Sequence, residues 1–319
     1  MSVVSRGPGA AAIEQAAVLL GPLAERGRPM GELTTYRVGG RAALFSQPDS
    51  VADLERLAVA VGATAIPVVV LGKGSNLLVA DSGFAGLCVR LADGFARVEI
   101  DADLVRAGGA AAYPVLARRT AAAGLSGLEW AVGIPGSVGG AVRMNAGGHG
   151  AQTSDFLVDC RIVSLHGGAE HLVAASALDL SYRHSSIGPY DVVTEASYRL
   201  EPGDAALATA RIDEVVRWRR EHQPGGQNAG SVFTNPPDDA AGRLIEEAGL
   251  KGFRIGSAVV SDKHANFIQA DPAGSADDVR RLVVAVRRAV AERLGVELEV
   301  EVQMVGWDPS LERADPPCS

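Results

Sequence analysis

Two glycine-rich stretches are candidates for a binding site in this 319-residue sequence. The first, Gly72-Lys73-Gly74-Ser75-Asn76, lies between two apolar segments. Glycine tolerates positive φ, so successive backbone N–H groups can point into one concavity and bind phosphate oxygens. The spacing fits neither a Walker A loop nor a dinucleotide-binding fingerprint. A plain hairpin turn is the alternative interpretation.

The second glycine-rich stretch extends from Gly133 to Gly150 and cannot form one regular element. A flat or extended ligand can lie directly on such a backbone, because glycine permits close approach. The alternative is a loop whose glycines allow a helix to pack tightly on a strand. The candidate binding residues here are Gly133, Ile134, Pro135, Gly136, Ser137, Gly139, Gly140, Asn145 and Gly147.

Two further positions carry side chains suited to catalysis or ligand binding. Arg183 follows Tyr182, and a guanidinium can clamp a carboxylate bidentately. Ser231 follows a glycine and precedes an apolar pair, so its hydroxyl can face a cleft, although the nucleophile-elbow spacing is absent. The alternatives are a solvated surface turn for the arginine and a turn or helix-cap serine.

A third candidate is a carboxylate near the C-terminus. Apolar and acidic residues alternate over residues 296–304, which predicts a strand with Glu297, Glu299 and Glu301 on one face. Periodicity alone does not choose among the three. A solvated strand face is the alternative for all of them.

Helix-like and strand-like segments must position these residues, and they predict an α+β chain. Ser275 and Asp278 have the spacing of a capping box. The expected helices are 51–61, 113–123, 205–221, 239–248 and 275–294, and the expected strands are 66–71, 77–80, 86–91, 160–165, 192–200 and 296–305. The expected division is a disordered leader over 1–12, regions over 13–91, 92–201 and 202–302, and the end of the last strand with a tail over 303–319.

Composition and charge exclude several classes of protein. With 30 basic and 38 acidic residues the net charge is −8, without the basic footprint of a nucleic-acid-binding protein. No apolar run is long enough to span a bilayer. The histidines lack metal-ligand spacing, so no metal site is expected. Cys88, Cys160 and Cys318 are scattered, which fits a reducing cytosol.

Taken together, the motifs and their order resemble the UDP-N-acetylenolpyruvoylglucosamine reductases, flavoenzymes of peptidoglycan precursor synthesis. Each motif alone is weak, whereas the ordered set is specific and covers nearly the whole chain. The matching segments are 34–40, 71–78, 127–140, 182–185, 229–236, 241–246, 250–252 and 301–306.

The resemblance implies an FAD-binding fold of the vanillyl-alcohol-oxidase type, built from two α+β subdomains, and a C-terminal α+β substrate-binding domain. The short span from Pro236 to Ala241 resembles the family's shorter subtype. FAD and NADPH are the implied cofactors. The implied protein is a cytoplasmic monomer that binds neither nucleic acid nor membrane.

The resemblance also implies a reaction. A hydride passes from NADPH through FAD to the vinyl methylene of the enolpyruvyl ether of UDP-N-acetylglucosamine, which gives UDP-N-acetylmuramate. Arg183 and Glu301 would stabilise the enolic intermediate electrostatically. Ser231 would protonate it in a dry site. Tyr182 and Asn235 would bind substrate.

Three positions depart from the family pattern. Thr234 stands where many relatives have Lys, and Arg143 and His149 replace other polar or aromatic residues. These departures bear on binding rather than on the reaction. Two other interpretations remain open: a different flavin-dependent oxidase or dehydrogenase on the same fold, and a non-catalytic UDP-sugar-binding relative.

Overall fold

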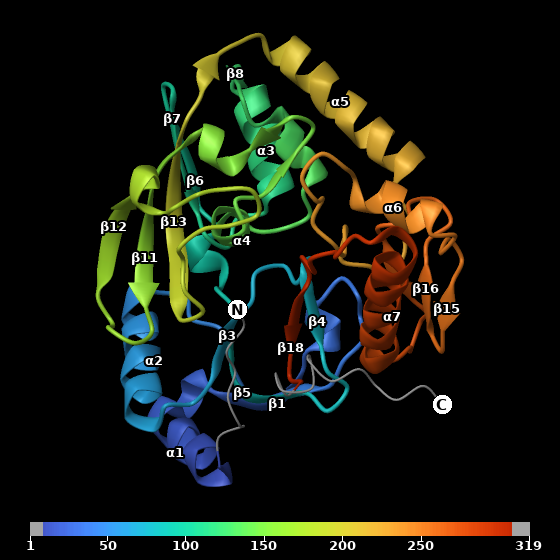
Figure 1. Cartoon of the computed structure of the whole chain (residues 1–319). Coiled ribbons are helices and arrows are strands. Elements are labelled where there is room, and N and C mark those ends of the chain that lie inside the picture. Colours follow the sequence, from blue (N-terminus) through green and yellow to red (C-terminus); the bar gives the residue numbers. More distant parts are fainter. Residues whose placement is uncertain (1–8, 308–319) are drawn as a thin grey trace.

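Helices and strands are mixed along residues 9–307, the part of the chain that this computed structural model describes, and the expected α+β class is confirmed (Figure 1). The helices are α1 (Ala10–Leu20), α2 (Val51–Thr64), α3 (Tyr113–Ala122), α4 (Val138–Arg143), α5 (Ala205–His222), α6 (Ala241–Glu247) and α7 (Ala276–Leu294). The strands are β1 (Glu25–Pro29), β2 (Arg41–Ser46), β3 (Val68–Val70), β4 (Leu77–Val79), β5 (Phe84–Val89), β6 (Val98–Asp101), β7 (Leu104–Gly108), β8 (Leu125–Ser126), β9 (Gly147–Gly148), β10 (Ala151–Gln152), β11 (Leu157–Ser164), β12 (Glu170–Ala174), β13 (Asp191–Arg199), β14 (Glu201–Pro202), β15 (Arg254–Ile255), β16 (Ala258–Val260), β17 (Ile268–Ala270) and β18 (Gln303–Val305).

The N-terminal sheet has the strand order β1-β2-β5-β3, with β2, β5 and β3 parallel. Its helix α2 begins where the side chain of Ser50 accepts a hydrogen bond from the N–H of Asp53. The apolar stripe of α2, which includes Leu54, Leu57 and Val61, is buried against this region. This packing leaves the loop after β3 free to face the middle of the molecule.

The second sheet is antiparallel, with the order β12-β11-β13-β7-β6. Helices α3 and α4 share its hydrophobic core, and Ala208 and Ile212 of α5 are buried in the same core. Helix α5 therefore packs with the second sheet, and it crosses the top of the molecule in Figure 1. Judged by packing, the C-terminal region begins after His222 rather than at the expected residue 202.

The C-terminal region combines α6 and α7 with the small sheet β15-β16-β17. Ser275 caps α7 by accepting a hydrogen bond from the N–H of Asp278 at 3.2 Å, as expected. The second hydrogen bond of the predicted capping box, from the N–H of Ser275 to the Asp278 carboxylate, does not form. The N–H of Ser275 donates to Ser257 Oγ, and the Asp278 carboxylate instead accepts from the N–H and hydroxyl of Ser257.

The strand predicted over 296–305 is divided between two partners. Val300 forms an isolated antiparallel bridge with Phe233, and β18 then pairs in parallel with β4. The predicted alternation holds, since Leu298 and Val302 are buried. The prediction of one continuous strand is wrong because its pairing partner changes within these few residues. The first partner is the segment 229–236, called the serine segment because it carries Ser231, and the second is β4. This change of partner brings the C-terminal region onto the N-terminal one beside β4 (Figure 1).

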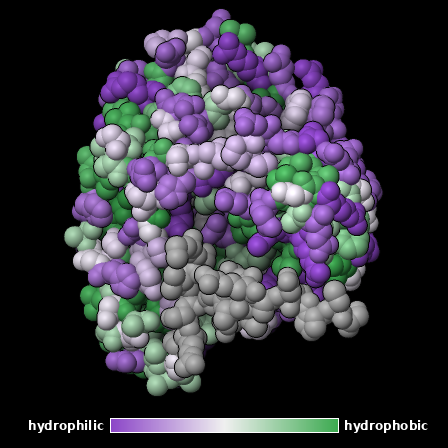
Figure 2. Space-filling view, viewed as in Figure 1, coloured by the Kyte–Doolittle hydropathy of each residue, from purple (hydrophilic) through white to green (hydrophobic). Residues whose placement is uncertain are grey.

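The expected leader over residues 1–12 is too long, because α1 begins at Ala10. The rest of that prediction, residues 1–8, and the tail from residue 308 lie outside the described residues. No helix between residues 9 and 307 combines the length and the apolar character needed to cross a membrane. Hydrophilic and hydrophobic residues are interspersed over the face seen in Figure 2.

Candidate functional site

A cleft of about 750 Å³ lies where the three regions meet, within the size range of small-molecule sites. Both glycine-rich stretches and the serine segment line it. The predicted site residues on its wall are Gly72, Lys73, Gly74, Ser75, Asn76, Gly133, Ile134, Pro135, Gly136, Ser137, Gly140, Gly147, Arg183, Ser231, Asn235 and Glu301. Three others, Gly139, Asn145 and Tyr182, are not part of the wall of this cleft.

The first glycine-rich stretch is not a hairpin turn. The strand before it, β3, pairs with β5, whereas the strand after it, β4, pairs with β18. A Cβ added at Gly72 would collide with Ser137 Oγ, so the two glycine-rich stretches touch each other. Gly74 has φ +65°, and a Cβ there would collide with the carbonyl of Leu33. Glycine is therefore required for the shape of this wall.

The second stretch contains α4, a short helix that the Ser137 side chain caps through the N–H of Gly140 at 3.2 Å. Its glycines serve two purposes. Gly136 and Gly140 line the cleft. Gly139 packs α4 on the sheet, since a Cβ there would lie 3.2 Å from the carbonyl oxygens of Gly109 and Val193. The tight-packing interpretation thus holds for Gly139, and ligand binding stays a prediction for Gly136 and Gly140.

Asn145 is completely buried and bonded within the protein. Its amide donates to the carbonyl of Ser181 at 2.9 Å and to Gln152 Oε1 at 3.3 Å, and its Oδ1 accepts from the N–H of Ser154. The structure therefore does not bring Asn145 to the cleft as a ligand for a cofactor. It ties the second stretch to the turn that carries Arg183 instead.

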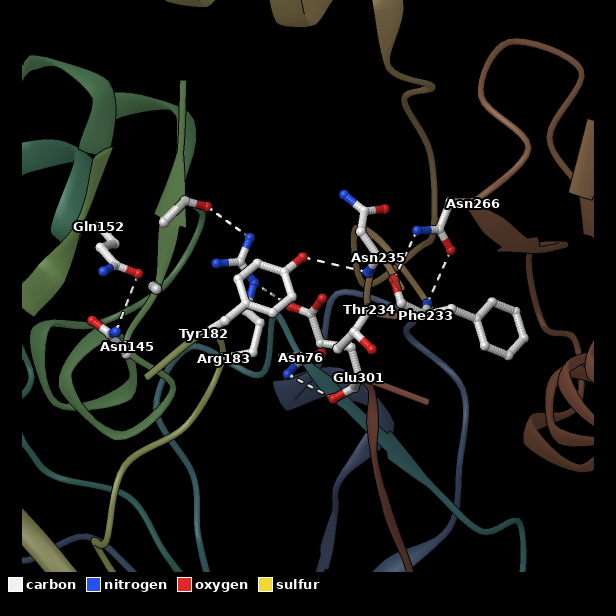
Figure 3. Close-up of polar contacts among 12 residues, drawn as sticks. Asn76, Asn145, Gln152, Tyr182, Arg183, Phe233, Thr234, Asn235, Asn266 and Glu301 are labelled. Atoms are coloured by element: carbon white, nitrogen blue, oxygen red, sulfur yellow. Dashed lines mark hydrogen bonds and ion pairs between the residues drawn. The ribbon is translucent and has the colours of Figure 1, made fainter. Parts of the chain in front are cut away.

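Arg183 and Glu301 form an ion pair on the cleft wall, with 3.1 Å between Nε and Oε1 (Figure 3). Arg183 adopts φ +56°, and its Nη2 also donates to the carbonyl of Gly147 at 2.9 Å. The ring of Tyr182 lies 4.9 Å from the guanidinium carbon. Among the three alternating glutamates, Glu297 and Glu299 are exposed, and only Glu301 reaches the cleft.

Burial governs the protonation of Glu301. Loss of hydration raises the pKa of its carboxyl above the usual value, although the charge and hydrogen bond of Arg183 oppose this rise. The net direction is upward, so the carboxyl keeps its proton to a higher pH than an exposed glutamate does. A neutral carboxylic acid can donate a hydrogen bond to a developing negative charge, which a carboxylate cannot.

Ser231 also lies on the cleft wall, in a segment held by internal hydrogen bonds. The carbonyl of Val232 accepts from the N–H of Glu301 at 2.8 Å. Asn266 binds both backbone groups of Phe233, as Figure 3 shows. The sequence analysis missed Asn266, because no local motif marks a side chain that holds a segment 33 residues away.

Asn235 and Tyr182 meet at the edge of the cleft. The Tyr182 hydroxyl accepts from the N–H of Asn235 at 3.4 Å (Figure 3), and the side-chain oxygen of Asn235 accepts from the N–H of Ala241 at the start of α6. The tyrosine ring remains half-exposed. This contact joins the arginine turn to the serine segment.

The end of α5 also contributes to the cleft. Trp218 and Arg219 line it together with His149, whose ring lies edge-on to the indole at 5.0 Å. Arg219 donates to the carbonyl of Gly133. Burial and the charge of Arg219 lower the pKa of His149. Sequence reasoning missed both α5 residues, since they belong to an ordinary Arg-rich amphipathic pattern.

The walls of the cleft fit FAD. Between residues 9 and 307, no group of three or more His, Cys, Asp or Glu side chains is arranged to hold a metal. The glycine-lined walls expose backbone with few side chains, and the cleft is large enough for an extended cofactor.

Comparisons with known proteins agree with this geometry. Residues 42–172 match the FAD binding domain family, and residues 222–305 match the family described as UDP-N-acetylenolpyruvoylglucosamine reductase, C-terminal domain. The start of the second match coincides with the end of α5.

Whole-chain relatives agree as well. UDP-N-acetylenolpyruvoylglucosamine reductase of Rubrobacter xylanophilus is 43% identical over 89% of this chain and 96% of its own, and that of Acidiphilium cryptum is 44% identical over 87% and 90%. The crystal structure of the Thermus caldophilus reductase superposes with a TM-score of 0.77 at 37% identity, over 89% of this chain and 99% of the other. The chain belongs to the family of UDP-N-acetylenolpyruvoylglucosamine reductases.

Proposed function

We propose that Arg183, Glu301 and Ser231 carry out the reduction of UDP-N-acetylglucosamine enolpyruvate to UDP-N-acetylmuramate in this flavoprotein oxidoreductase of peptidoglycan synthesis. The observation that carries the proposal is the half-buried Arg183–Glu301 pair, which shares one cleft with Ser231 and the two glycine-rich stretches. The ion pair joins residues 118 positions apart, and both side chains lie on the wall of that cleft.

The two glycine-rich stretches would hold the cofactor through their backbones. Bound FAD supplies the reaction with a hydride that originates from NADPH. Gly72 to Asn76 and Gly133 to Gly140 form walls with few side chains, which suit a flat, phosphate-bearing molecule. In the second stretch the N–H groups of Val138, Gly139 and Gly140 already donate within the protein. Gly139 would act by packing α4 rather than by contact with the ligand.

Arg183 and Glu301 would stabilise the enolic intermediate of the substrate. When a hydride reaches the vinyl methylene, negative charge develops on the adjacent carbon and its carboxylate. The fixed guanidinium offers positive charge, and the Glu301 carboxyl, whose pKa burial raises, offers a hydrogen-bond donor. Neither group needs to move, because both are held by protein contacts before substrate arrives.

Ser231 would then donate the proton that completes the product. A serine hydroxyl is a weak acid, but it can protonate a strongly basic carbanionic carbon where bound ligands keep water away. The hydrogen bonds that hold Val232 and Phe233 keep this hydroxyl in a fixed segment. Tyr182 and Asn235, linked at the edge of the cleft, would bind the substrate.

The departures from the family pattern would affect binding alone. Thr234 uses its N–H and hydroxyl on the carbonyl of Glu299, and Arg143 donates to the carbonyls of Ile187 and Gly188. Both side chains are thereby partly occupied by the protein. We further propose a cytoplasmic monomer that binds neither nucleic acid nor membrane.

An anaerobic half-reaction experiment tests this proposal. In Ser231→Ala we expect NADPH to reduce the flavin at the normal rate, while reoxidation by the enolpyruvyl substrate slows by about 10² to 10⁴. Ser231→Cys keeps a proton donor at the position and should recover part of the loss.

Equal slowing of both half-reactions would contradict the role of Ser231 as proton donor. Purified protein without flavin absorbance would favour a non-catalytic binder. Fast reduction by NADPH with no reoxidation by the enolpyruvyl sugar nucleotide, even in the unchanged protein, would favour a different flavin oxidoreductase.

A further inference from the structure

The backbone of Glu301 is held from two sides of the cleft. Its N–H donates to the carbonyl of Val232, next to Ser231, at 2.8 Å. Its carbonyl accepts from the side-chain amide of Asn76 at 3.2 Å (Figure 3) and from that of Gln303 at 3.3 Å. The peptide groups on both sides of this residue therefore have fixed orientations.

Asn76 connects the first glycine-rich stretch to this segment. Its own carbonyl accepts from the N–H of Gln303 at 3.2 Å, which extends the pairing of β4 with β18 by one residue. The side-chain amide then reaches past that contact to the carbonyl of Glu301. One residue thus holds the end of the C-terminal segment through both its backbone and its side chain.

We propose that Asn76 is a positioning residue whose side chain aims the Glu301 carboxyl at the reacting carbon, an inference that rests on the proposed function of Glu301. Local sequence groups Asn76 with the cofactor-binding residues. In the structure its amide nitrogen donates to the carbonyl of Glu301, so part of the side chain is committed to the Glu301 segment rather than to the cofactor.

The direction of the Glu301 side chain depends on how its backbone is held. The Glu301 carboxyl must meet Arg183 at 3.1 Å and face the cleft at the same time. Without the Asn76 amide, the carbonyl of Glu301 keeps only the flexible Gln303 side chain. The N–H of the same peptide, on Val302, keeps one long contact of 3.4 Å to the carbonyl of Val232, so the peptide is held less firmly. A displacement of about 1 Å at a reacting group can lower a rate by about 10²-fold.

The test compares Asn76→Ala and Asn76→Asp in the flavin-loaded enzyme. We expect reoxidation by the enolpyruvyl substrate to slow by about 10- to 100-fold, with reduction by NADPH unchanged. Asn76→Asp keeps the shape but turns an oxygen towards the Glu301 carbonyl, so its loss should be at least as large. Thr64→Ala removes a side-chain contact to a backbone carbonyl outside the cleft, that of Ala60 at 2.7 Å, and serves as the control.

Two further measurements separate positioning from cofactor binding. Titration of the apoprotein with FAD, followed by flavin fluorescence, should give the same affinity for Asn76→Ala and the unchanged protein within about threefold. The pH profile of reoxidation should move to lower pH in Asn76→Ala, because a released Glu301 carboxyl becomes more hydrated and its raised pKa falls.

A double-mutant comparison decides the outcome. If Asn76 acts through Glu301, Asn76→Ala should have almost no further effect in a Glu301→Gln background. The positioning role is wrong if the effects of Asn76→Ala and Glu301→Gln on reoxidation are fully additive. It is also wrong if Asn76→Ala weakens FAD binding in proportion to its effect on the rate of reoxidation. If Glu301→Gln alone leaves reoxidation unchanged, the proposed function itself fails, and the role of Asn76 fails with it.

Discussion

The two parts of the cleft wall are built on different principles. The glycine-rich part consists of short local segments whose backbones form the surface. The part proposed to act in catalysis, the reacting part, consists of three side chains, from Arg183, Ser231 and Glu301, that come from different regions of the chain. The first kind of wall depends on the absence of side chains, and the second on their relative placement.

This difference determines which changes each part tolerates. A backbone surface is damaged by adding atoms, because any Cβ at a close-packed glycine must displace a neighbour. A side-chain constellation is damaged by removing atoms or by moving the segments that hold them. Cofactor affinity should therefore report on the first wall, and reaction with the enolpyruvyl substrate on the second.

The largest expected effect is in the reacting part. Glu301→Gln keeps the size of the side chain but removes the acidic proton, so reoxidation by substrate should slow by about 10² to 10³ while reduction by NADPH is unchanged. Stopped-flow absorbance of the flavin measures both rates. Glu299→Gln, on the same alternating segment but exposed, is the matched control and should change neither rate. Sensitivity at Glu299 instead would show that the wrong glutamate has been assigned.

A smaller effect is expected in the glycine-rich part. Gly72→Ala places a Cβ against Ser137 Oγ, which caps α4, and the expected result is about tenfold weaker FAD binding, in line with the loss of one helix cap. The affinity is measured by fluorescence titration of the apoprotein. Once saturated with FAD, the variant should reoxidise at the normal rate.

Gly62→Ala is the control for that substitution. Gly62 lies in α2, and no atom lies within 4 Å of an added Cβ. Alanine there should leave FAD affinity unchanged and raise the free energy of unfolding by about 1 kcal/mol. Unchanged FAD binding in Gly72→Ala would show that the glycine-rich wall tolerates added atoms. The two parts of the cleft wall would then not differ in the way proposed.

The smallest expected effect is a displacement of the pH profile. Burial raises the pKa of Glu301, and the positive charge of Arg183 lowers it. In the proposed mechanism reoxidation requires the protonated carboxyl, so its rate should fall as pH rises through that pKa. In Arg183→Gln the lowering contribution is lost, and the falling limb should move to higher pH, besides any loss of maximal rate. If the falling limb of the pH profile stays in place in Arg183→Gln, a group other than Glu301 titrates there.

Sequence patterns were informative where a property repeats locally. The α+β class and the cap at Ser275 follow from residue types within a few positions. The alternation over 296–304 correctly identified Leu298 and Val302 as buried. The same pattern did not reveal that the segment changes its pairing partner, because a hydrophobic period contains no information about which strand lies alongside.

The sequence by itself determined the family, the chemistry of the glycine-rich wall and the short list of candidate side chains, since these depend on residue type and order. Only the tertiary structure showed that Glu301, which the resemblance had singled out, pairs with Arg183, that Asn145 is withdrawn from the cleft and that the Asn76 side chain turns towards Glu301. The physical reason is that each of these outcomes depends on a partner 36 to 225 residues away. Such partners meet only when the separate hydrophobic cores pack together and β18 pairs with β4.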